Sequence, residues 1–341
     1  MLEKPGIEDE HLIARVQAEY GLSASGLTFL PLGADVNTAV YQLETGDGKA
    51  YFLKLRSGLF DEMTVAVPQF LHSQSIQAII APLPTRNHRN WGSLDSYRMI
   101  LYPYIPGRDG YEAALSDQQW INLGLALKGV HTALVPPDIQ KHLQRESFSS
   151  QWREMVRQFQ AQVETTIYDD PVADRLAAFM RTRRSQISYM VYRSGELSHL
   201  LHSASLEFVL CHTDVHPGNY LLSTDGALYL VDWDNPLLAP KERDLMSIGA
   251  GMAGDLPGGR EESLFYQGYG DVEIDWRALA YYRYERIIVD IAEFCKQLLR
   301  SNEGGKDRQQ SYHYFTSSFL PGHVVEIAFQ SDRNFSHSFS L

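Results

Sequence analysis

The segment Cys211–Asp234 constrains the fold and the chemistry of this chain more than any other stretch. Two short apolar runs within it flank Thr224-Asp225-Gly226, which is a strong signal for a β-hairpin turn. A hairpin brings its two open ends together, so we predict that Asn219 and Asp232 lie side by side. An amide oxygen next to a carboxylate suits a hard cation such as Mg²⁺.

A His-x-Asp-x-x-x-x-Asn pattern, formed by His212, Asp214 and Asn219, leads into this hairpin. Phosphoryl transfer uses an Asp that accepts the proton of the attacking hydroxyl, and an Asn and a second Asp that hold Mg²⁺. We therefore predict that Asp214 is catalytic and that Asn219 and Asp232 bind the metal. Single His, Asp and Asn residues near turns usually cap helices or close loops, but four matching positions around one hairpin favour the catalytic interpretation.

A metallohydrolase is the minor alternative for the same residues. In a strand, His212, Asp214 and His216 would share one face and could bind a metal together with two acids downstream. Pro217-Gly218 fits a loop better than a strand, and no further His cluster follows.

The eight residues His212–Asn219 (HTDVHPGN) resemble the catalytic loop of the aminoglycoside phosphotransferase and choline kinase family. They lack the Arg that protein kinases carry directly after the His. Val231–Asp234 and Ala239–Met246 extend the resemblance, which covers the chain from about residue 2 to residue 329. Within this resemblance, His212 and Asp244 take supporting roles at the catalytic loop, although an acid at a helix start such as Asp244 can equally complement the helix dipole.

The resemblance implies an α+β, protein-kinase-like bilobal fold, with a small antiparallel-sheet N-lobe and a mainly helical C-lobe. Residues 1–103 are expected to form the nucleotide-binding lobe, and residues 104–330 the catalytic and substrate lobe. Residues 331–341 are polar and aromatic without a period, which predicts a disordered tail.

Lys54 lies within the apolar strand Ala50–Leu55, where a charge is costly unless it is paired. The resemblance implies that Lys54 holds the α- and β-phosphates of ATP, with Glu62 on the next helix as its partner. Taken alone, Lys54 fits an edge-strand lysine whose amine reaches solvent, but the catalytic pattern downstream favours the phosphate role.

Two backbone segments are expected to contact ATP. In the loop before the strand Ala39–Leu43, Asn37 and Thr38 would donate to the phosphates; this loop has one Gly where protein kinases have three. The resemblance also makes residues 102–105 the hinge beside adenine, lined by Tyr102, Tyr104 and Ile105. An ordinary turn and an ordinary linker fit the two segments equally well.

Asp234 and Asp290 are the candidate substrate residues, because a carboxylate attracts an acceptor ammonium group. Asp290 lies one helical turn after Arg286, on the same face of the helix expected at Trp276–Arg300. A solvated helix face is the simpler interpretation of this pair.

Hydrophobic periodicity predicts most of the remaining elements. Helices are expected at Glu8–Tyr20, Asp61–His72 (with a kink or break at Pro68), Asp117–Thr132, Gln151–Val163, Asp174–Leu201 and Trp276–Arg300, and a further one is entered at Lys241–Asp244. Strands are expected at Leu27–Leu30, Ala39–Leu43, Ala50–Leu55, Ala78–Ile80 and Tyr97–Leu101. The Gly-rich stretch Gly249–Gly259 predicts a mobile loop.

Composition excludes several classes of function. The chain has 341 residues, which suits two lobes, and a formal net charge of −12 without a basic stripe, which argues against nucleic-acid binding. No apolar run is long enough for a membrane span, and no signal peptide begins the chain. Two cysteines provide no disulfide framework, so we expect a cytoplasmic protein.

Together these features predict an ATP- and Mg²⁺-dependent O-phosphotransferase. The resemblance implies a small-molecule acceptor, a hydroxylated and cationic aminocyclitol such as spectinomycin, and hence antibiotic inactivation; the acidic charge agrees with this. A metabolic kinase for choline, homoserine or methylthioribose is the first alternative. A non-catalytic nucleotide-binding pseudokinase is the second, and the intact Lys54, Asp214, Asn219 and Asp232 argue against it.

Overall fold

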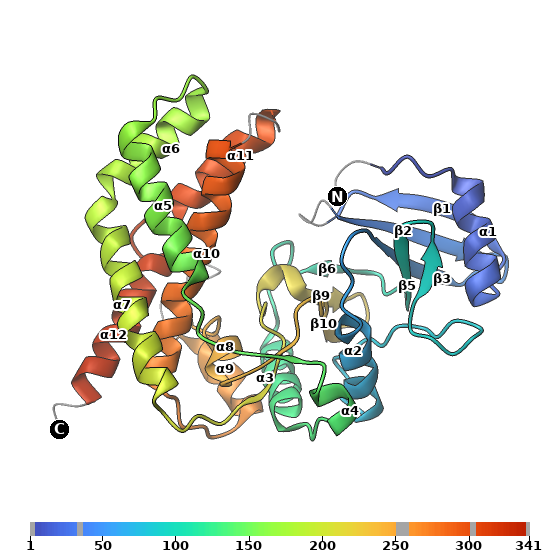
Figure 1. Ribbon diagram of the computed structural model, residues 1–341. Coiled ribbons are helices and arrows are strands. Elements are labelled where there is room, and N and C mark those ends of the chain that lie inside the picture. Colours follow the sequence, from blue (N-terminus) through green and yellow to red (C-terminus); the bar gives the residue numbers. More distant parts are fainter. Residues whose placement is uncertain (1–3, 33–36, 250–258, 301–304, 339–341) are drawn as a thin grey trace. The chain divides into compact units, whose positions relative to one another are not determined.

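The computed structural model describes residues 4–32, 37–249, 259–300 and 305–338 (Figure 1). Packing of the chain divides it into two compact units. Unit 1 comprises Met1–Gln144 and His216–Pro236, and unit 2 comprises Arg145–Val215 and Leu237–Leu341. The predicted hairpin thus belongs to the same unit as the N-terminal sheet, whereas the residues just before it belong to unit 2. The lobe boundary after residue 103 stays a prediction.

An antiparallel sheet in the order β1-β2-β3-β5-β4 forms the first part of unit 1. Its strands are β1 (Ala24–Leu30), β2 (Thr38–Thr45), β3 (Ala50–Arg56), β4 (Gly92–Leu94) and β5 (Tyr97–Pro103). Helix α1 (Asp9–Tyr20) contacts β1 and β4, and it buries Leu12 and Val16 against Tyr41 and Leu53 of the sheet. This core holds β3, and therefore Lys54, in a fixed place.

The second sheet of unit 1 is the predicted hairpin with one added strand, in the order β10-β9-β6. Its strands are β6 (Gly107–Asp109), β9 (Tyr220–Ser223) and β10 (Leu228–Leu230). Gly226 turns the chain with φ +90°, a backbone conformation that favours glycine. The hairpin prediction is confirmed, because Tyr220 pairs with Leu230 and Leu222 with Leu228.

Four short or medium helical elements complete unit 1. They are α2 (Met63–Ser73), α3 (Asp117–Thr132), α4 (Pro137–Gln140) and the 3₁₀ helix η1 (Pro217–Asn219). Helix α2 runs on through Pro68, so of the expected kink or break the break is absent, and the kink stays a prediction. The expected strand at Ala78–Ile80 was wrong: its apolar character reflects burial in an irregular segment, where the Ala78 carbonyl accepts from Leu230 N at 2.9 Å.

Unit 2 is mainly helical and contains two paired strands, β8 (Val209–Cys211) and β11 (Leu237–Ala239). Its helices are α5 (Gln151–Thr165), α6 (Pro171–Thr182), α7 (Arg184–His202), α8 (Glu242–Leu245), α9 (Arg260–Tyr269), α10 (Trp276–Arg300), α11 (Gly305–Ser317) and α12 (Val324–Ser338). A two-residue strand, β7 (Gln144–Arg145), lies where the units divide.

Helix α10 is the central helix of unit 2, and α5, α6, α7, α11 and α12 all contact it. Its inner face buries Tyr281, Tyr284, Ile288, Ile291 and Cys295 in one large apolar core. Because this face is anchored along its whole length, residues on the opposite face of α10 project from a rigid support.

Two sequence-based expectations for unit 2 differ from the structure, and a third falls outside the described residues. The single helix expected at Asp174–Leu201 is two helices that meet at Arg183, because both α6 and α7 turn to pack on α5. The segment from residue 331 onward, which was expected to be a disordered tail, continues helix α12 as far as residue 338. Within it, the Asp332 carboxylate binds the Arg193 guanidinium at 2.8 Å. Of the expected mobile loop Gly249–Gly259, residues 250–258 lie outside the described residues.

The fold class is the predicted one: α+β, with an N-terminal antiparallel sheet and a mainly helical C-terminal part of the kinase-like type. Among the described residues, no helix combines the length and the apolar character needed to cross a membrane.

Candidate functional site

Lys54 forms the centre of a charge cluster in unit 1. Its Nζ lies 2.8 Å from Oδ1 of Asp232 and 2.8 Å from Oδ1 of Asp234, and its side chain is only 12% exposed. Burial lowers the pKa of Lys54, but the two carboxylates outweigh burial, so the net shift is above the ordinary value of 10.5. The strand lysine is therefore a fixed, paired cation.

Arg56 binds the other oxygen of the Asp234 carboxylate through NH1. Lys54 and Arg56 are two residues apart on β3, so both side chains stand on one face of the sheet. Sequence reasoning missed Arg56, although two cations at alternate strand positions were a usable signal. Both oxygens of the Asp234 carboxylate are bound, one by Lys54 and the other by Arg56. These contacts favour a role of Asp234 in holding Lys54 over the expected role of binding the acceptor directly.

Asn219 and Asp232 stand at the open ends of the hairpin, as predicted. The carbonyl of Asn219 accepts a hydrogen bond from Val231 N at 3.0 Å, which places Asp232 one residue beyond the paired position. Asp232 adopts φ +66°, a left-handed conformation that few non-glycine residues take and that occurs at functional sites. An amide and a carboxylate held in this way fit the oxygen-donor preference of Mg²⁺.

Glu62 is not a partner of Lys54 in the part of the chain that the structure describes. It is exposed at the start of α2, where it lines a cavity of about 570 Å³ together with Arg56 and Asp234. Lys54 has Asp232 and Asp234 within 2.8 Å, and these two acids supply the compensating charge expected from Glu62.

Of the expected hinge residues, Tyr102 lies within β5, where it pairs with Phe52, and Tyr104 and Ile105 follow this strand before β6 begins. Tyr102 lies near the charge cluster: burial raises its pKa to about 12, and the Lys54 charge acts in the opposite direction. The N–H of Tyr104 donates to the Ala50 carbonyl at 3.1 Å, and Ile105 is half-buried beside it. Adenine contact by these three residues stays a prediction.

Asn37 and Thr38 mark the entry into β2. The Asn37 carbonyl accepts from Ser57 N at 2.9 Å, and Thr38 pairs with Arg56 in the sheet. Residues 33–36 of the expected phosphate loop lie outside the described residues. The described part of the loop therefore starts close to the Lys54 cluster on β3.

In unit 2, Asp244 holds the loop that follows β8. Its fully buried carboxylate accepts from His212 N at 2.8 Å and from Thr213 N at 2.7 Å. Thr213 adopts φ +76°, which is unusual for a β-branched residue. His212 is buried and its Nδ1 accepts from Asp214 N at 3.3 Å. These contacts are what the predicted supporting roles of His212 and Asp244 require.

Asp214 forms an ion pair that sequence reasoning missed. Its Oδ1 lies 2.9 Å from NH1 of Arg286 on α10, and the Nε of the same guanidinium lies 3.2 Å from Oδ1 of Asp290. The coulombic effect of Asp290, followed by that of Asp214, raises the pKa of Arg286 above its ordinary value. The same-face prediction for Arg286 and Asp290 is confirmed, but no sequence signal links Arg286 to Asp214, 72 positions away.

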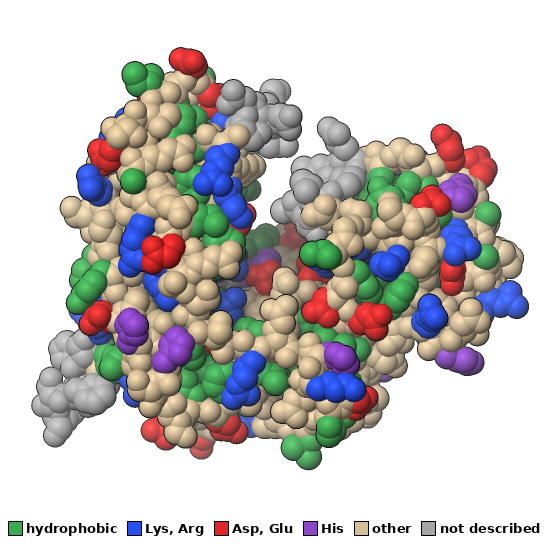
Figure 2. Space-filling model, viewed as in Figure 1, with side chains coloured by type: hydrophobic (Ala, Val, Ile, Leu, Met, Phe, Trp, Pro, Cys, Tyr) green, Lys and Arg blue, Asp and Glu red, His purple; other side chains and the backbone are tan. Residues whose placement is uncertain are grey.

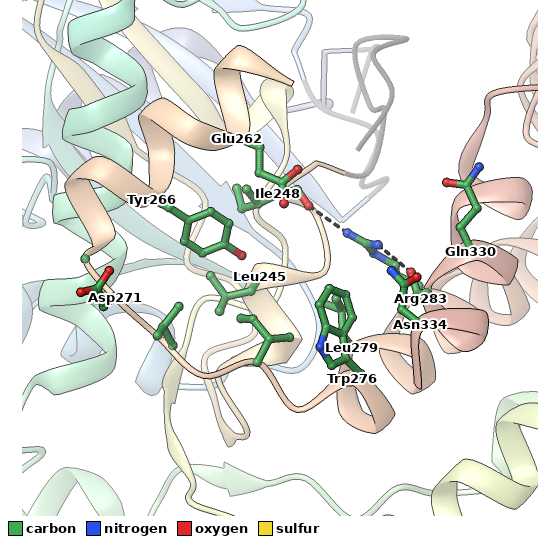
Figure 3. Close-up of a pocket in the computed structure, with 14 residues that line it drawn as sticks. Leu245, Ile248, Glu262, Tyr266, Asp271, Trp276, Leu279, Arg283, Gln330 and Asn334 are labelled. Atoms are coloured by element: carbon green, nitrogen blue, oxygen red, sulfur yellow. Dashed lines mark hydrogen bonds between the residues drawn. The ribbon is translucent and has the colours of Figure 1, made fainter. Parts of the chain in front are cut away.

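A cavity of about 510 Å³ in unit 2 involves none of the predicted site residues (Figure 3). On its wall, Arg283 donates to the carbonyls of Met246 and Ile248 and to Ser331 Oγ, at 3.0, 2.9 and 2.6 Å. These bonds tie α10 to α12 and to the segment after α8. Burial lowers the pKa of Arg283 to about 10, which marks a guanidinium that is poorly solvated.

The surface face in Figure 2 mixes acidic and basic side chains. On this face the described Lys and Arg side chains form no continuous stripe, and the expected absence of nucleic-acid binding stays a prediction.

The chain is similar to known phosphotransferases over most of its length. The profile of the phosphotransferase enzyme family (APH) matches residues 28–282. A crystal structure of spectinomycin phosphotransferase APH(9)-Ia in complex with ADP and spectinomycin is 37% identical in sequence, with a TM-score of 0.89 over 96% of this chain and 99% of that one. The AMP-bound complex of APH(9)-Ia gives 36% identity and a TM-score of 0.85, over 95% and 98% of the two chains.

A more distant structure has the same fold. An aminoglycoside phosphotransferase from Alicyclobacillus acidocaldarius is 15% identical, with a TM-score of 0.65 over 98% of both chains. At this level of identity the likeness concerns the fold alone.

Proposed function

Because the chain belongs to the phosphotransferase enzyme family, we propose that it transfers the γ-phosphoryl group of ATP, with Mg²⁺, to a hydroxyl of an aminocyclitol such as spectinomycin. One observation carries the proposal. A largely buried strand lysine, Lys54, is paired with Asp232, which follows one strand of the hairpin, and Asn219 precedes the other strand. The family template needs these three residues on the nucleotide side.

The nucleotide side of the reaction is assigned to unit 1. Asn219 and Asp232 would hold Mg²⁺, which neutralises phosphate charge when it is bound. Lys54 would bind the α- and β-phosphates. Asp234 would hold the Lys54 ammonium in place, and Arg56 would in turn hold Asp234. Tyr102, Tyr104 and Ile105 are the proposed adenine contacts, and Asn37 and Thr38 the proposed phosphate-loop donors.

The acceptor side is assigned to unit 2, with Asp214 as the catalytic residue. The acceptor oxygen attacks the γ-phosphorus, the bond between that phosphorus and the bridging oxygen of ADP breaks, and Asp214 takes the hydroxyl proton. In a loose transition state the proton leaves late, so orientation of the hydroxyl matters as much as basicity. His212 and Asp244 hold the backbone on which Asp214 stands.

The choice of acceptor is supported by similarity and by charge. The relative at 37% identity was crystallised with spectinomycin, and the two chains correspond over nearly their whole lengths. A net charge of −12 attracts a cationic amine, and Asp290 adds a carboxylate near Asp214 through their shared Arg286. Inactivation of the antibiotic in the cell is the proposed consequence.

The test is an acceptor screen with purified protein, ATP and Mg²⁺, in which ADP release and phosphorylated product are measured. Spectinomycin should be turned over, and choline, homoserine and methylthioribose should not. Turnover of one of these three instead would make the protein a metabolic kinase. A thermal shift with ATP but no ADP release would indicate a pseudokinase, and hydrolysis without ATP would indicate a metallohydrolase.

Two variants test the assigned residues within the same assay. Asp214→Ala and Asp232→Ala should both remain folded and lose turnover, since a positioned base contributes about 10²–10⁴-fold in rate and loss of a metal ligand should cost at least as much. Activity near that of the unchanged protein in either variant contradicts the role assigned to that residue.

A further inference from the structure

We propose that Arg286 is a positioning residue for phosphoryl transfer: it orients the Asp214 carboxylate and is itself held by Asp290. The inference rests on the proposed function of this site. The contacts are direct, at 2.9 Å from Arg286 NH1 to Asp214 Oδ1 and 3.2 Å from Arg286 Nε to Asp290 Oδ1. All three residues belong to unit 2.

Asp214 needs such an orienting group because it stands on a loop. The backbone before it is fixed by Asp244, through His212 N and Thr213 N, whereas Arg286 acts on the Asp214 carboxylate itself. A catalytic base works only when its oxygen faces the reacting hydroxyl, and a third group commonly sets that direction. A carboxylate has about four acceptor sites, so contact with Arg286 leaves it able to accept from a hydroxyl.

Arg286 is suited to this task by its support. Its neighbours Ile287 and Ile288 are buried in the core of unit 2, which fixes the backbone of α10 at this point. Asp290, one helical turn further on, holds the Nε edge of the guanidinium while NH1 reaches Asp214. Because the guanidinium is planar, holding one edge also fixes the direction of the other.

This arrangement gives Asp290 an indirect role. A carboxylate on the same face of α10 was expected to bind an acceptor ammonium group directly. In the structure it binds Arg286, so we assign it to holding the guanidinium. The three side chains carry one positive and two negative charges, and their net charge of about −1 still attracts a cationic acceptor.

Stability and turnover should respond differently to the loss of Arg286, which distinguishes a positioning role from a role in stabilising the fold. The side chains of Arg286, Asp214 and Asp290 are 45%, 41% and 35% exposed, and exposed ion pairs contribute only about 0–1 kcal/mol to stability. Removal of Arg286 should therefore hardly change the melting temperature. A large loss of turnover without a loss of stability would be the signature of a group that orients the base.

The experiment uses Arg286→Gln, Arg286→Lys, Asp290→Asn and the double variant Arg286→Gln/Asp290→Asn. Arg157→Gln is the matched control, since it removes an exposed arginine that pairs with Glu154 on α5 of the same unit. For each protein we would measure the melting temperature, and kcat and KM for ATP and for the acceptor that the unchanged protein phosphorylates.

We expect kcat to fall by about 10- to 100-fold in Arg286→Gln, with little change in either KM or in melting temperature. This is less than the about 10²–10⁴-fold contribution of the positioned base itself, because Arg286 only orients that base. Arg286→Lys should recover part of kcat, because an ammonium keeps the charge but not the planar fork. Asp290→Asn should have a smaller effect, and the double variant should be no slower than Arg286→Gln, since both residues act through one contact.

Three results would overturn the proposal. The first is kcat in Arg286→Gln equal to that of Arg157→Gln. The second is a rise of acceptor KM at constant kcat, which would make Arg286 and Asp290 acceptor ligands. The third is an additive loss in the double variant. If Arg286→Gln does not fold, Arg286→Lys and Asp290→Asn decide by the same kcat criterion. An unchanged protein without ATP-dependent turnover on any acceptor would instead refute the proposed function.

Discussion

Replacement of Asp244 by Asn should destabilise unit 2 and slow catalysis together. The Asp244 carboxylate is fully buried and accepts two backbone N–H bonds, from His212 and Thr213. An amide keeps one acceptor oxygen but presents an NH₂ group to the second N–H, which is left unsatisfied. Hydrogen bonds to a charged group contribute about 1.5–3 kcal/mol, and an orphaned buried donor costs about 1–3 kcal/mol. The change should therefore cost about 2–4 kcal/mol.

Differential scanning calorimetry is the appropriate assay, because the two units can unfold in separate transitions. For a unit of this size about 1 kcal/mol corresponds to 2–4 °C, so the transition of unit 2 should fall by about 5–15 °C. Asp169→Asn is the matched control, an exposed acid in the same unit. A melting temperature of Asp244→Asn within about 2 °C of this control would refute the reasoning. Turnover should fall as well, because the backbone before Asp214 loses its support.

Two further predictions concern other ion pairs. Lys54→Met should weaken binding of ATP by about 10- to 100-fold, the equivalent of one charge-assisted bond of about 1.5–3 kcal/mol, as measured with a fluorescent nucleotide; unchanged affinity would exclude a phosphate contact. At the start of α6, the Ala173 N–H, followed by Arg308, lowers the pKa of Asp170 below its ordinary value of 3.8. The stabilisation by Asp170 is thus present above pH 3.8 and is lost as the pH falls through the lowered value. Asp170→Ala should cost about 0.5–2 kcal/mol at pH 7, and the gap between the unfolding curves should narrow towards pH 3; a constant gap would contradict this assignment.

Local sequence signals predicted the parts of the fold that depend on local structure. The Thr224-Asp225-Gly226 turn and its flanking apolar runs determine the hairpin, and the helices at Asp117–Thr132 and Trp276–Arg300 begin and end where their capping and periodicity place them. The hairpin alone sufficed to bring Asn219 close to Asp232. The apolar run at Ala78–Ile80 failed as a strand signal, because a buried segment of irregular structure has the same composition as a buried strand.

Choices between distant partners could not be predicted in this way. Lys54 lies 178 positions before Asp232 and only 8 before Glu62, and the structure pairs it with the distant acid. Arg286 has an acid one helical turn away, which the sequence indicates, and another on a loop 72 positions away, which it does not. Packing of whole units decides such pairs, and a single sequence carries no record of that packing.

The antiparallel pairing of β8 with β11 suggests where the chain can be extended. Cys211 lies opposite Leu237, so the stretch between them leaves and re-enters unit 2 at one pair of strands, and within this stretch the chain reverses direction at the Asp225-Gly226 turn. The ends of this stretch are held by the pairing of Cys211 with Leu237 and by the pairing of Tyr220 with Leu230. Because the entropy of closing a loop rises by only about 0.6 kcal/mol for each doubling of its length, a short peptide tag inserted at this tip should be tolerated.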